Sequence, residues 1–344
     1  MKKPVSPSPI NHQPSAIRNK ERVLQKYRIL CMSILVAAVC ASGARAETAK
    51  LTSHKQMMTR LASLDLIDDT SGAGRLGIEV IGKSVKGKDI PMVTVRDPNS
   101  VTETPKRLFI ICRQHGNEPA STEAMLGLIE DLAFSTDENV KDVLSKVTFY
   151  IVPMMNPDGA DIMRRRNANG ADLNRDWLNL WQPETQCVRA AINRIIPDVI
   201  IDEHELASRN RGDFVETAGP MSGAPPEVAA ECERMQKLVV GMLRTHDLSV
   251  ISYEIADQSP ARLAHRYFPI HAGTKTILFE SRQSGARRYQ LQYRTKLHVV
   301  GTMTVAKYLA GQGDQLTQRI AEYESRRWLM LASRGKKPAP KRTK

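Results

Sequence analysis

Four nearly continuous apolar runs constrain this chain more than any other feature of its sequence. Residues 107–112 read Arg-Leu-Phe-Ile-Ile-Cys, and similar runs lie at 147–153, 197–202 and 276–279. Apolar runs of this length are typical of strands buried on both faces of a sheet. Because helical patterns separate the runs, the sequence predicts an α/β fold with a largely parallel or mixed sheet.

The remaining expected elements follow from apolar periodicity and from turn residues. Two β-rich runs, 76–81 and 90–95, are joined by residues 82–88, and the glycines in that linker predict a hairpin. Apolar stripes at helical spacing predict helices, and Pro119 suits a first helical turn. The helices expected on this basis cover residues 52–65, 119–134, 226–246 and 288–310.

The basic excess of the chain lies at its two ends. Of the net charge of +13, residues 1–46 contribute +7 and residues 334–344 contribute +6. The residues between them are close to neutral overall, unlike a domain that binds a polyanion over its folded surface. We therefore expect no nucleic-acid partner, a solvated basic tail at 334–344, and one folded domain over 47–333.

The N-terminal end has the layout of an export signal. Basic residues between 20 and 28 precede a mostly apolar stretch at 29–41, and Ala44-Arg45-Ala46 follows. A basic region, an apolar segment too short to cross a bilayer and a small-x-small site make up a signal peptide. We expect cleavage after Ala46 and an exported protein, periplasmic or secreted, without a stable membrane span. Retention of the segment as an anchor, or burial as a core helix, are the alternatives.

Residues with metal-binding side chains follow two of the buried runs. His115 and Glu118 lie three residues apart in a Gly-containing loop after 107–112, and His204 follows 197–202. Carboxyl ends of strands are where sites form in open α/β sheets. Zinc accepts imidazole nitrogen and carboxylate oxygen, and a catalytic site uses three protein ligands. Asp202 or Glu203 is placed to orient the His204 ring as an outer partner.

Two further segments at strand ends carry charged residues. Asn156-Pro157-Asp158-Gly159 is followed by three arginines at 164–166 and by Asp172-Leu173-Asn174-Arg175. Arginine binds carboxylates through two parallel hydrogen bonds, so this region is typical of an anion-recognition loop or, alternatively, of a solvated basic loop. Glu280 ends the run at 276–279, where a partly buried carboxylate can serve as a general base or simply as a structural residue.

Taken in order, these segments resemble the zinc carboxypeptidase family, the carboxypeptidase A-like metallopeptidases. The matching pieces are Ile81-Gly82-Lys83-Ser84 with Gly87, His115-x-x-Glu118, Asn156-Pro157-Asp158-Gly159, Asp172-Leu173-Asn174-Arg175, His204 and Glu280, and they span about residues 75–285. The resemblance implies a three-layer α/β/α fold. It also implies a peptide substrate with a free C-terminal carboxylate, with cell-envelope peptides as one candidate class.

The same resemblance implies a role for each residue of the site. His115, Glu118 and His204 would hold one Zn²⁺, and Glu280 would be the general base that activates the attacking water. Asn174 and Arg175 would grip the terminal carboxylate of the substrate. Arg165 matches the spacing of the arginine that stabilises the oxyanion, although Arg164 and Arg166 are open alternatives.

Two features depart from the family pattern. The gap from Glu118 to His204 is longer than in the digestive enzymes, and neither Tyr253 nor Tyr267 lies in the context of the family's mobile substrate-binding tyrosine. Two other functions therefore stay open: an amide deacylase of the aspartoacylase and succinylglutamate desuccinylase type, and a catalytically inactive module that retains zinc.

Overall fold

An eight-stranded mixed sheet forms the centre of the structure, a computed structural model that describes residues 51–206, 212–255, 262–283 and 290–333. The strand order is β1-β2-β4-β3-β5-β8-β6-β7. Parallel pairing joins β4, β3, β5 and β8 in the middle of the sheet and joins β6 to β7 at one edge. The β1–β2, β2–β4 and β6–β8 pairs are antiparallel. The strands are β1 Leu76–Lys83, β2 Asp89–Val95, β3 Lys106–Cys112, β4 Val147–Val152, β5 Val199–Leu206, β6 Asp213–Ala218, β7 Val250–Ile255 and β8 Lys275–Arg282.

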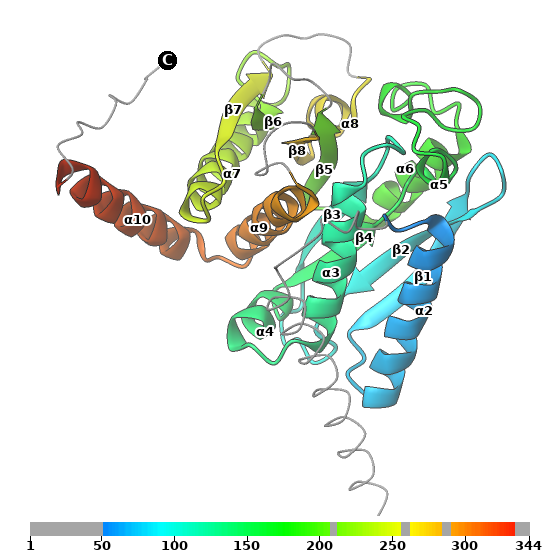
Figure 1. The fold of residues 1–344 in the computed structure, drawn as a ribbon, viewed down its shortest axis with the longest axis horizontal. Helices are drawn as coiled ribbons and strands as arrows, with labels where there is room; N and C mark the ends of the chain where they lie inside the picture. The colour runs from blue at the N-terminus through cyan, green and yellow to red at the C-terminus, as the bar shows by residue number, and fades with distance from the viewer. Residues whose placement is uncertain (1–50, 207–211, 256–261, 284–289, 334–344) are drawn as a thin grey trace, which may run out of the picture. The chain divides into compact units, whose positions relative to one another are not determined.

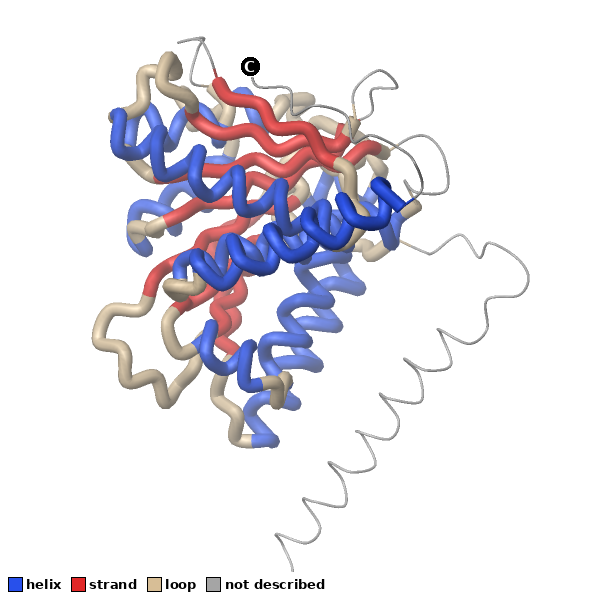
Figure 2. The backbone as a smooth tube through the Cα atoms, turned by 90° about the vertical axis from the view of Figure 1, so that its left-hand side faces the viewer, coloured by secondary structure: helices blue, strands red, loops and turns tan. Residues whose placement is uncertain are grey.

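Helices cover both faces of the sheet, which confirms the predicted three-layer α/β/α architecture (Figures 1 and 2). Helices α2, α3, α4, α7 and α9 pack on one face, and α6, α8 and the 173–177 segment pack on the other. The helices are α2 His54–Ser71, α3 Ala120–Phe134, α4 Glu138–Leu144, α5 Pro157–Asp161, α6 Pro183–Ile195, α7 Pro226–Thr245, α8 Ala264–Tyr267, α9 Leu291–Leu309 and α10 Gly313–Ser333, with short turns η1 Leu173–Arg175 and η2 Phe268–Ala272.

Strand alternation distributes the core between these two layers. On β3, Leu108 and Ile110 face the α3 and α9 layer, while Phe109 and Ile111 face the α6 layer, and all four are fully buried. Burial on both faces explains why the β3 run is continuously apolar. The same alternation on β5 and β8 decides which polar side chains meet at the functional site.

Most of the expected elements form where the sequence predicts them. The first helix, expected over 52–65, forms as α2 but continues to Ser71. Ser53 caps its start in a capping box with Gln56, and Gly72 caps its end in the left-handed conformation. The expected hairpin is the β1–β2 pair, closed by a turn in which the Gly87 N–H donates to the Ser84 carbonyl. The helix expected at 288–310 is observed as α9, with residues 288–289 outside the described part.

The sequence-based boundaries are wrong at the functional ends of two strands. β5 continues past Asp202 to Leu206, and β8 continues past Phe279 to Arg282, so His204 and Glu280 lie within strands. Asp202, Glu203, Glu205 and Ser281 remain in the sheet beyond the apolar runs because each has a buried or partly buried partner. Strands β6 and β7 and helices α4, α6 and α10 are additions to the expected set.

The predicted signal segment, 1–46, and the predicted basic tail, 334–344, lie outside the described residues. Within the part of the chain that the structure describes, none of the helices combines the length and apolar character needed to cross a bilayer.

Candidate metal centre

The loop between β3 and α3 brings His115 and Glu118 together. The imidazole Nδ1 of His115 lies 2.8 Å from Glu118 Oε1, and both side chains are buried. Arg113 shapes the start of this loop with a backbone φ of 56°, and its buried guanidinium donates to the Gly116 carbonyl. The loop geometry therefore turns both ligand side chains toward one point.

Strand β5 supplies the third ligand candidate to the same point. His204 Nδ1 lies 2.9 Å from Glu118 Oε2 and 3.1 Å from His115 Nδ1. The donor atoms of these three residues all lie within 4.8 Å of one another, and all three residues are buried. Two imidazole nitrogens and a carboxylate around one point form a donor set suited to zinc.

Each histidine is held from behind by a carboxylate. His115 Nε2 lies 3.0 Å from Asp172 Oδ1, and His204 Nε2 lies 2.9 Å from Asp202 Oδ1. A proton on each Nε2, donated to these carboxylates, leaves both Nδ1 lone pairs for a cation. This arrangement fits a metal site better than a structural cluster of ion pairs, because both rings present the same atom to the same point.

The buried carboxylates are held in their charged form by the histidines. Burial alone would raise the pKa of Glu118, but the charges and hydrogen bonds of His115 and His204 outweigh it and lower that pKa to about 2. Burial likewise opposes ionisation of Asp202, yet His204 and His265 hold its pKa well below the usual range. The carboxylates of the centre are therefore ionised at neutral pH, as a cation site requires.

Glu280 lies opposite His204 in the parallel pairing of β5 and β8. It is partly buried, and its Oε2 atom makes no hydrogen bond within the described residues. Burial raises the pKa of Glu280 to about 7; His204 opposes this shift and the Glu118 carboxylate adds to it. A carboxyl group with this pKa beside the candidate metal centre is suited to accept a proton near neutral pH.

The arginine run places one guanidinium next to the ligands. Arg165 Nη1 lies 3.3 Å from Glu118 Oε1, and its Nε donates to Asp172 Oδ2 over 3.1 Å. Arg166 instead donates to the Gly170 carbonyl at the exposed end of the loop. Among the arginines with a described side-chain contact in this run, Arg165 is therefore the one that reaches the centre.

Asn174 and Arg175 occupy different environments in the short turn η1. The Asn174 side chain is buried, accepts from the Ala264 N–H and places its Nδ2 atom 3.0 Å from His204 Nε2. The Arg175 guanidinium is more exposed; burial lowers its pKa, Asp172 raises it, and the positive charges of Arg165, Arg262 and Arg266 lower it further. A group of like charges at the edge of the centre favours an anionic ligand.

The Asn156–Gly159 segment supports the metal loop instead of binding an anion within the described contacts. Asn156 Nδ2 donates to the Gln114 and Arg165 carbonyls, over 3.2 and 3.3 Å. Gly116 packs so closely here that a Cβ would lie 2.1 Å from the Gly159 carbonyl carbon. Asp158 in turn accepts from the Lys86 N–H of the β1–β2 turn.

Several residues of the centre were not identified from the sequence. Gln114 donates to Asp202 and accepts from the Trp177 indole, so it links β5 to the 173–177 segment. His265 Nδ1 lies 3.4 Å from Asp202 Oδ2, and its Nε2 lies 3.3 Å from Glu216 Oε2. Gln114 follows the apolar run of β3, so its position at a strand end could have identified it. His265 does not follow an apolar run, so this reasoning could not have identified it.

The two tyrosines considered in the sequence lie in other surroundings. Tyr267 accepts a hydrogen bond from Arg189, whose guanidinium also lies over the tyrosine ring. Tyr253 is partly exposed on β7 and packs edge-on against Phe214.

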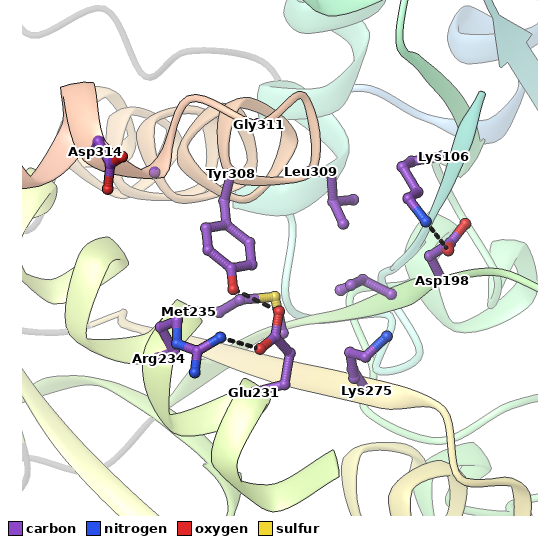
Figure 3. Close-up of a pocket in the computed structure, with 12 residues that line it drawn as sticks. Lys106, Asp198, Glu231, Arg234, Met235, Lys275, Tyr308, Leu309, Gly311 and Asp314 are labelled. Carbon is purple, nitrogen blue, oxygen red and sulfur yellow. Dashed lines mark hydrogen bonds and ion pairs between the residues drawn. The ribbon is translucent and has the colours of Figure 1, made fainter. Parts of the chain in front are cut away.

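A cavity of about 450 Å³ opens at the amino-terminal ends of the central strands (Figure 3). Lys106, Val199 and Lys275, which line it, are the first residues of β3, β5 and β8, whereas the candidate metal ligands lie toward the carboxyl ends of the strands. Its charges are largely paired, as in the Lys106–Asp198 and Arg234–Glu231 contacts. The cavity is therefore separate from the chemistry described above.

Comparisons with known proteins agree with this geometry. The zinc carboxypeptidase family model matches residues 69–308. Carboxypeptidase 2 of Trichophyton rubrum is 32% identical over 150 residues, which are 41% of this chain and 28% of that protein. Carboxypeptidase D of Mus musculus is 33% identical over 118 residues, 31% of this chain and 9% of that protein. The chain thus spans about a quarter or less of the length of several of the curated relatives it matches.

Solved structures show the same fold. A metallo-carboxypeptidase from Burkholderia cenocepacia aligns with a TM-score of 0.63 at 22% identity, covering 74% of this chain and 68% of that one. A metallo-carboxypeptidase from Pseudomonas aeruginosa, in complex with (2-guanidinoethylmercapto)succinic acid, aligns with a TM-score of 0.62 at 23% identity, covering 77% and 70%. Because the family model covers more than half of its length, the chain belongs to the zinc carboxypeptidase family.

Proposed function

We propose that this member of the zinc carboxypeptidase family is a metallocarboxypeptidase that hydrolyses the C-terminal peptide bond of peptides. One observation supports the proposal above all others. The Nδ1 atoms of His115 and His204 and the Glu118 carboxylate point at one another, and a carboxylate stands behind each imidazole. We assign one Zn²⁺ to these three ligands.

Bound zinc would act as a Lewis acid that lowers the pKa of its water to about 7. Glu280 then accepts the proton of the attacking water and delivers it to the leaving amine, a role that suits its pKa of about 7. Arg165 supplies a positive charge beside Glu118, where negative charge develops on the carbonyl oxygen.

The substrate's terminal carboxylate is assigned to the cationic edge of the centre. Arg175 is exposed enough to meet a ligand, and Arg165, Arg262 and Arg266 surround it with positive charge. Asn174 joins it in the proposal, although its amide oxygen already accepts from Ala264, so its share in carboxylate binding passes through the Nδ2 atom. This arrangement favours a peptide with a free C-terminus.

The domain limits and the location of the protein belong to the same proposal. Residues 1–46 form an export signal, residues 47–333 form the catalytic domain, and residues 334–344 form a basic tail. An exported enzyme of this kind would meet peptides of the cell envelope or of the surroundings.

The test uses purified residues 47–344. Bound zinc is measured by mass spectrometry, and release of C-terminal residues is measured on a mixed peptide library. We expect stepwise trimming that a chelator stops, and that Glu280→Gln reduces at least about 10³-fold while zinc stays bound. Glu254→Gln serves as the matched control, because Glu254 is an exposed strand carboxylate on β7.

The alternatives give different results in the same experiment. Zinc binding with cleavage of N-acyl amino acids, and without trimming of peptides, would replace the carboxypeptidase by an amide deacylase. Zinc binding without turnover of either substrate would identify an inactive binding module. Equal trimming by the wild type and by Glu280→Gln would remove the assigned general base.

A further inference from the structure

A buried polar network lies on the other face of the strands that carry the metal centre. On β5, His204 faces the centre while Glu203 and Glu205 face α9, and on β8 Glu280 faces the centre while Ser281 faces α9. Glu203 and Ser281 are fully buried, and Glu205 is almost so. Charged groups are rarely placed in such surroundings without partners, so their partners indicate what they do.

Helix α9 supplies those partners from a single stripe. Arg294, His298 and Thr302 stand at every fourth position, so they lie on one side of the helix. Arg294 pairs with Glu205, His298 pairs with Glu203 through Nδ1, and the Thr302 hydroxyl donates to Glu203 Oε1 over 3.0 Å. We call the six residues on both sides of this contact the α9 network: Glu203, Glu205, Ser281, Arg294, His298 and Thr302.

The network ties the two central strands to each other as well as to the helix. His298 Nε2 lies 3.0 Å from the Ser281 hydroxyl, so one imidazole connects β5 to β8. The helix lies close to the sheet at this place, because a Cβ on Gly301 would meet the Phe279 ring at 2.7 Å. His204 lies opposite Glu280 on the same two strands. The network therefore holds together the two strands whose register sets the separation of His204 and Glu280.

Glu205 extends the network to the third element of the centre. Its Oε2 accepts from the Ala120 N–H at the first residue of α3, over 3.0 Å. Its own N–H donates to Glu118 Oε2, also over 3.0 Å. The α9 network therefore contacts β5, β8 and the start of α3, which are the elements that carry or adjoin His204, Glu280 and Glu118.

We propose that the α9 network is a positioning device for the metal centre. Helix α9 holds β5, β8 and the start of α3 in one arrangement, so that the ligands on one strand and the general base on the next keep the separation that zinc binding and hydrolysis need. Burying several charged groups costs stability, and such groups are retained in some proteins because they specify one geometry. The hydrolysis part of this inference rests on the proposed function, whereas the zinc part does not.

The Ser281–His298–Glu203 contacts have the order of a hydrolytic triad, but they are not assigned as a second active site. All three side chains have no exposed surface. A nucleophile must contact its substrate, so a completely buried hydroxyl serves the geometry of the strands instead.

Two buried threonines of α9 provide a matched test. Thr302→Val removes the hydroxyl that donates to Glu203, while Thr304→Val removes a hydroxyl that donates to the Val300 carbonyl of the same helix. The zinc dissociation constant is measured by competition with a chromophoric chelator, together with kcat and KM on a cleaved peptide and the unfolding temperature. We expect Thr302→Val to weaken zinc binding and lower kcat about 3- to 10-fold, with KM within about twofold. Thr304→Val is expected to stay within about twofold of the wild type.

A second pair of variants removes and restores the imidazole bridge. His298→Leu loses both bonds and is expected to weaken zinc binding about 10- to 100-fold, whereas His298→Gln can donate to Glu203 and accept from Ser281 and should recover most of the loss. If His298→Leu does not fold, the threonine pair decides. Equal zinc affinity and equal kcat for Thr302→Val and Thr304→Val would overturn the inference. If the wild type cleaves no peptide, the proposed function fails, and the zinc affinities still test the positioning role.

Discussion

Glu280 combines three properties at one position: partial burial, proximity to His204 across the β5–β8 pairing, and a carboxylate oxygen without a hydrogen bond in the described part of the chain. Its pKa of about 7 is set first by burial, with Glu118 adding to the shift. A structural carboxylate would be paired, as Asp202 is with His204. A raised pKa together with a buried oxygen that has no partner among the described residues is therefore the residue-level sign that favours the proposed catalytic role.

The raised pKa of Glu280 predicts that the metal-free protein loses free energy of unfolding as the pH rises. The folded state keeps the proton to about pH 7, whereas an unfolded chain releases it near its ordinary pKa. Stability from this group is thus present at acid pH and lost as the pH rises toward 7. Glu280→Gln should therefore be more stable relative to the wild type at pH 8 than at pH 5, by on the order of 1–2 kcal/mol after allowing for solvent screening.

Urea unfolding of chelator-treated wild type and Glu280→Gln at both pH values measures this difference. Other titrating groups are shared by the two proteins, so they cancel in the comparison. The same stability difference at pH 5 and pH 8 would mean that Glu280 has an ordinary pKa in the folded protein.

Strand-end reasoning found the residues that the chain itself places at strand ends. His115, Glu118, His204 and Glu280 each follow or end an apolar run, and the structure brings them to one region. His265 and the α9 members of the network (Arg294, His298 and Thr302) could not be found in this way, because they lie on helices far away in the sequence from their partners. A histidine in a short helix such as α8 carries no local pattern that distinguishes it from a surface residue.

At the scale of elements, apolar runs located strands but did not locate their ends. β5 and β8 each continue beyond their apolar run, because Glu203, Glu205 and Ser281 find partners on α9. An apolar sequence pattern ends at the first charged residue, even when that residue is buried. The hydrogen bonds between neighbouring strands continue past it. Strands β6 and β7 are only six residues long and mix polar with apolar residues without a regular alternation, so their signal is weaker than that of the continuous runs.

Contact between the metal loop and the Asn156–Gly159 segment leads to a prediction about Gly116. A Cβ at this position would lie 2.1 Å from the Gly159 carbonyl carbon and 2.3 Å from the Ala160 nitrogen, both backbone atoms. Gly116→Ala must therefore move the loop that carries His115 and Glu118. We expect zinc affinity to fall at least about 10-fold and stability to fall by about 2 kcal/mol or more.

Gly127→Ala is the matched control for this substitution. Gly127 lies in the interior of α3, and a Cβ there meets nothing within 4 Å. The control should be as stable as the wild type or up to about 1 kcal/mol more stable, with unchanged zinc affinity. Wild-type zinc affinity in Gly116→Ala would show that the loop is not held by this contact.

At the scale of the whole molecule, charge is divided between the ends and the centre. The ends carry the basic excess of the sequence, while the centre places Glu118, Asp172 and Asp202 around two histidines. Their lowered pKa values keep these carboxylates ionised at neutral pH. A cation bound among them would stabilise the folded chain, since the unfolded chain has no such arrangement.

The position of the metal in zinc-loaded crystals, measured by anomalous scattering at the zinc edge, tests the assigned ligands most directly. We expect one strong peak at about 2.0–2.1 Å from Nδ1 of both His115 and His204, with a Glu118 oxygen at about 2.0–2.2 Å. A peak bound through the Nε2 atoms, a peak at other residues, or no peak from protein that binds zinc in solution would contradict this ligand assignment.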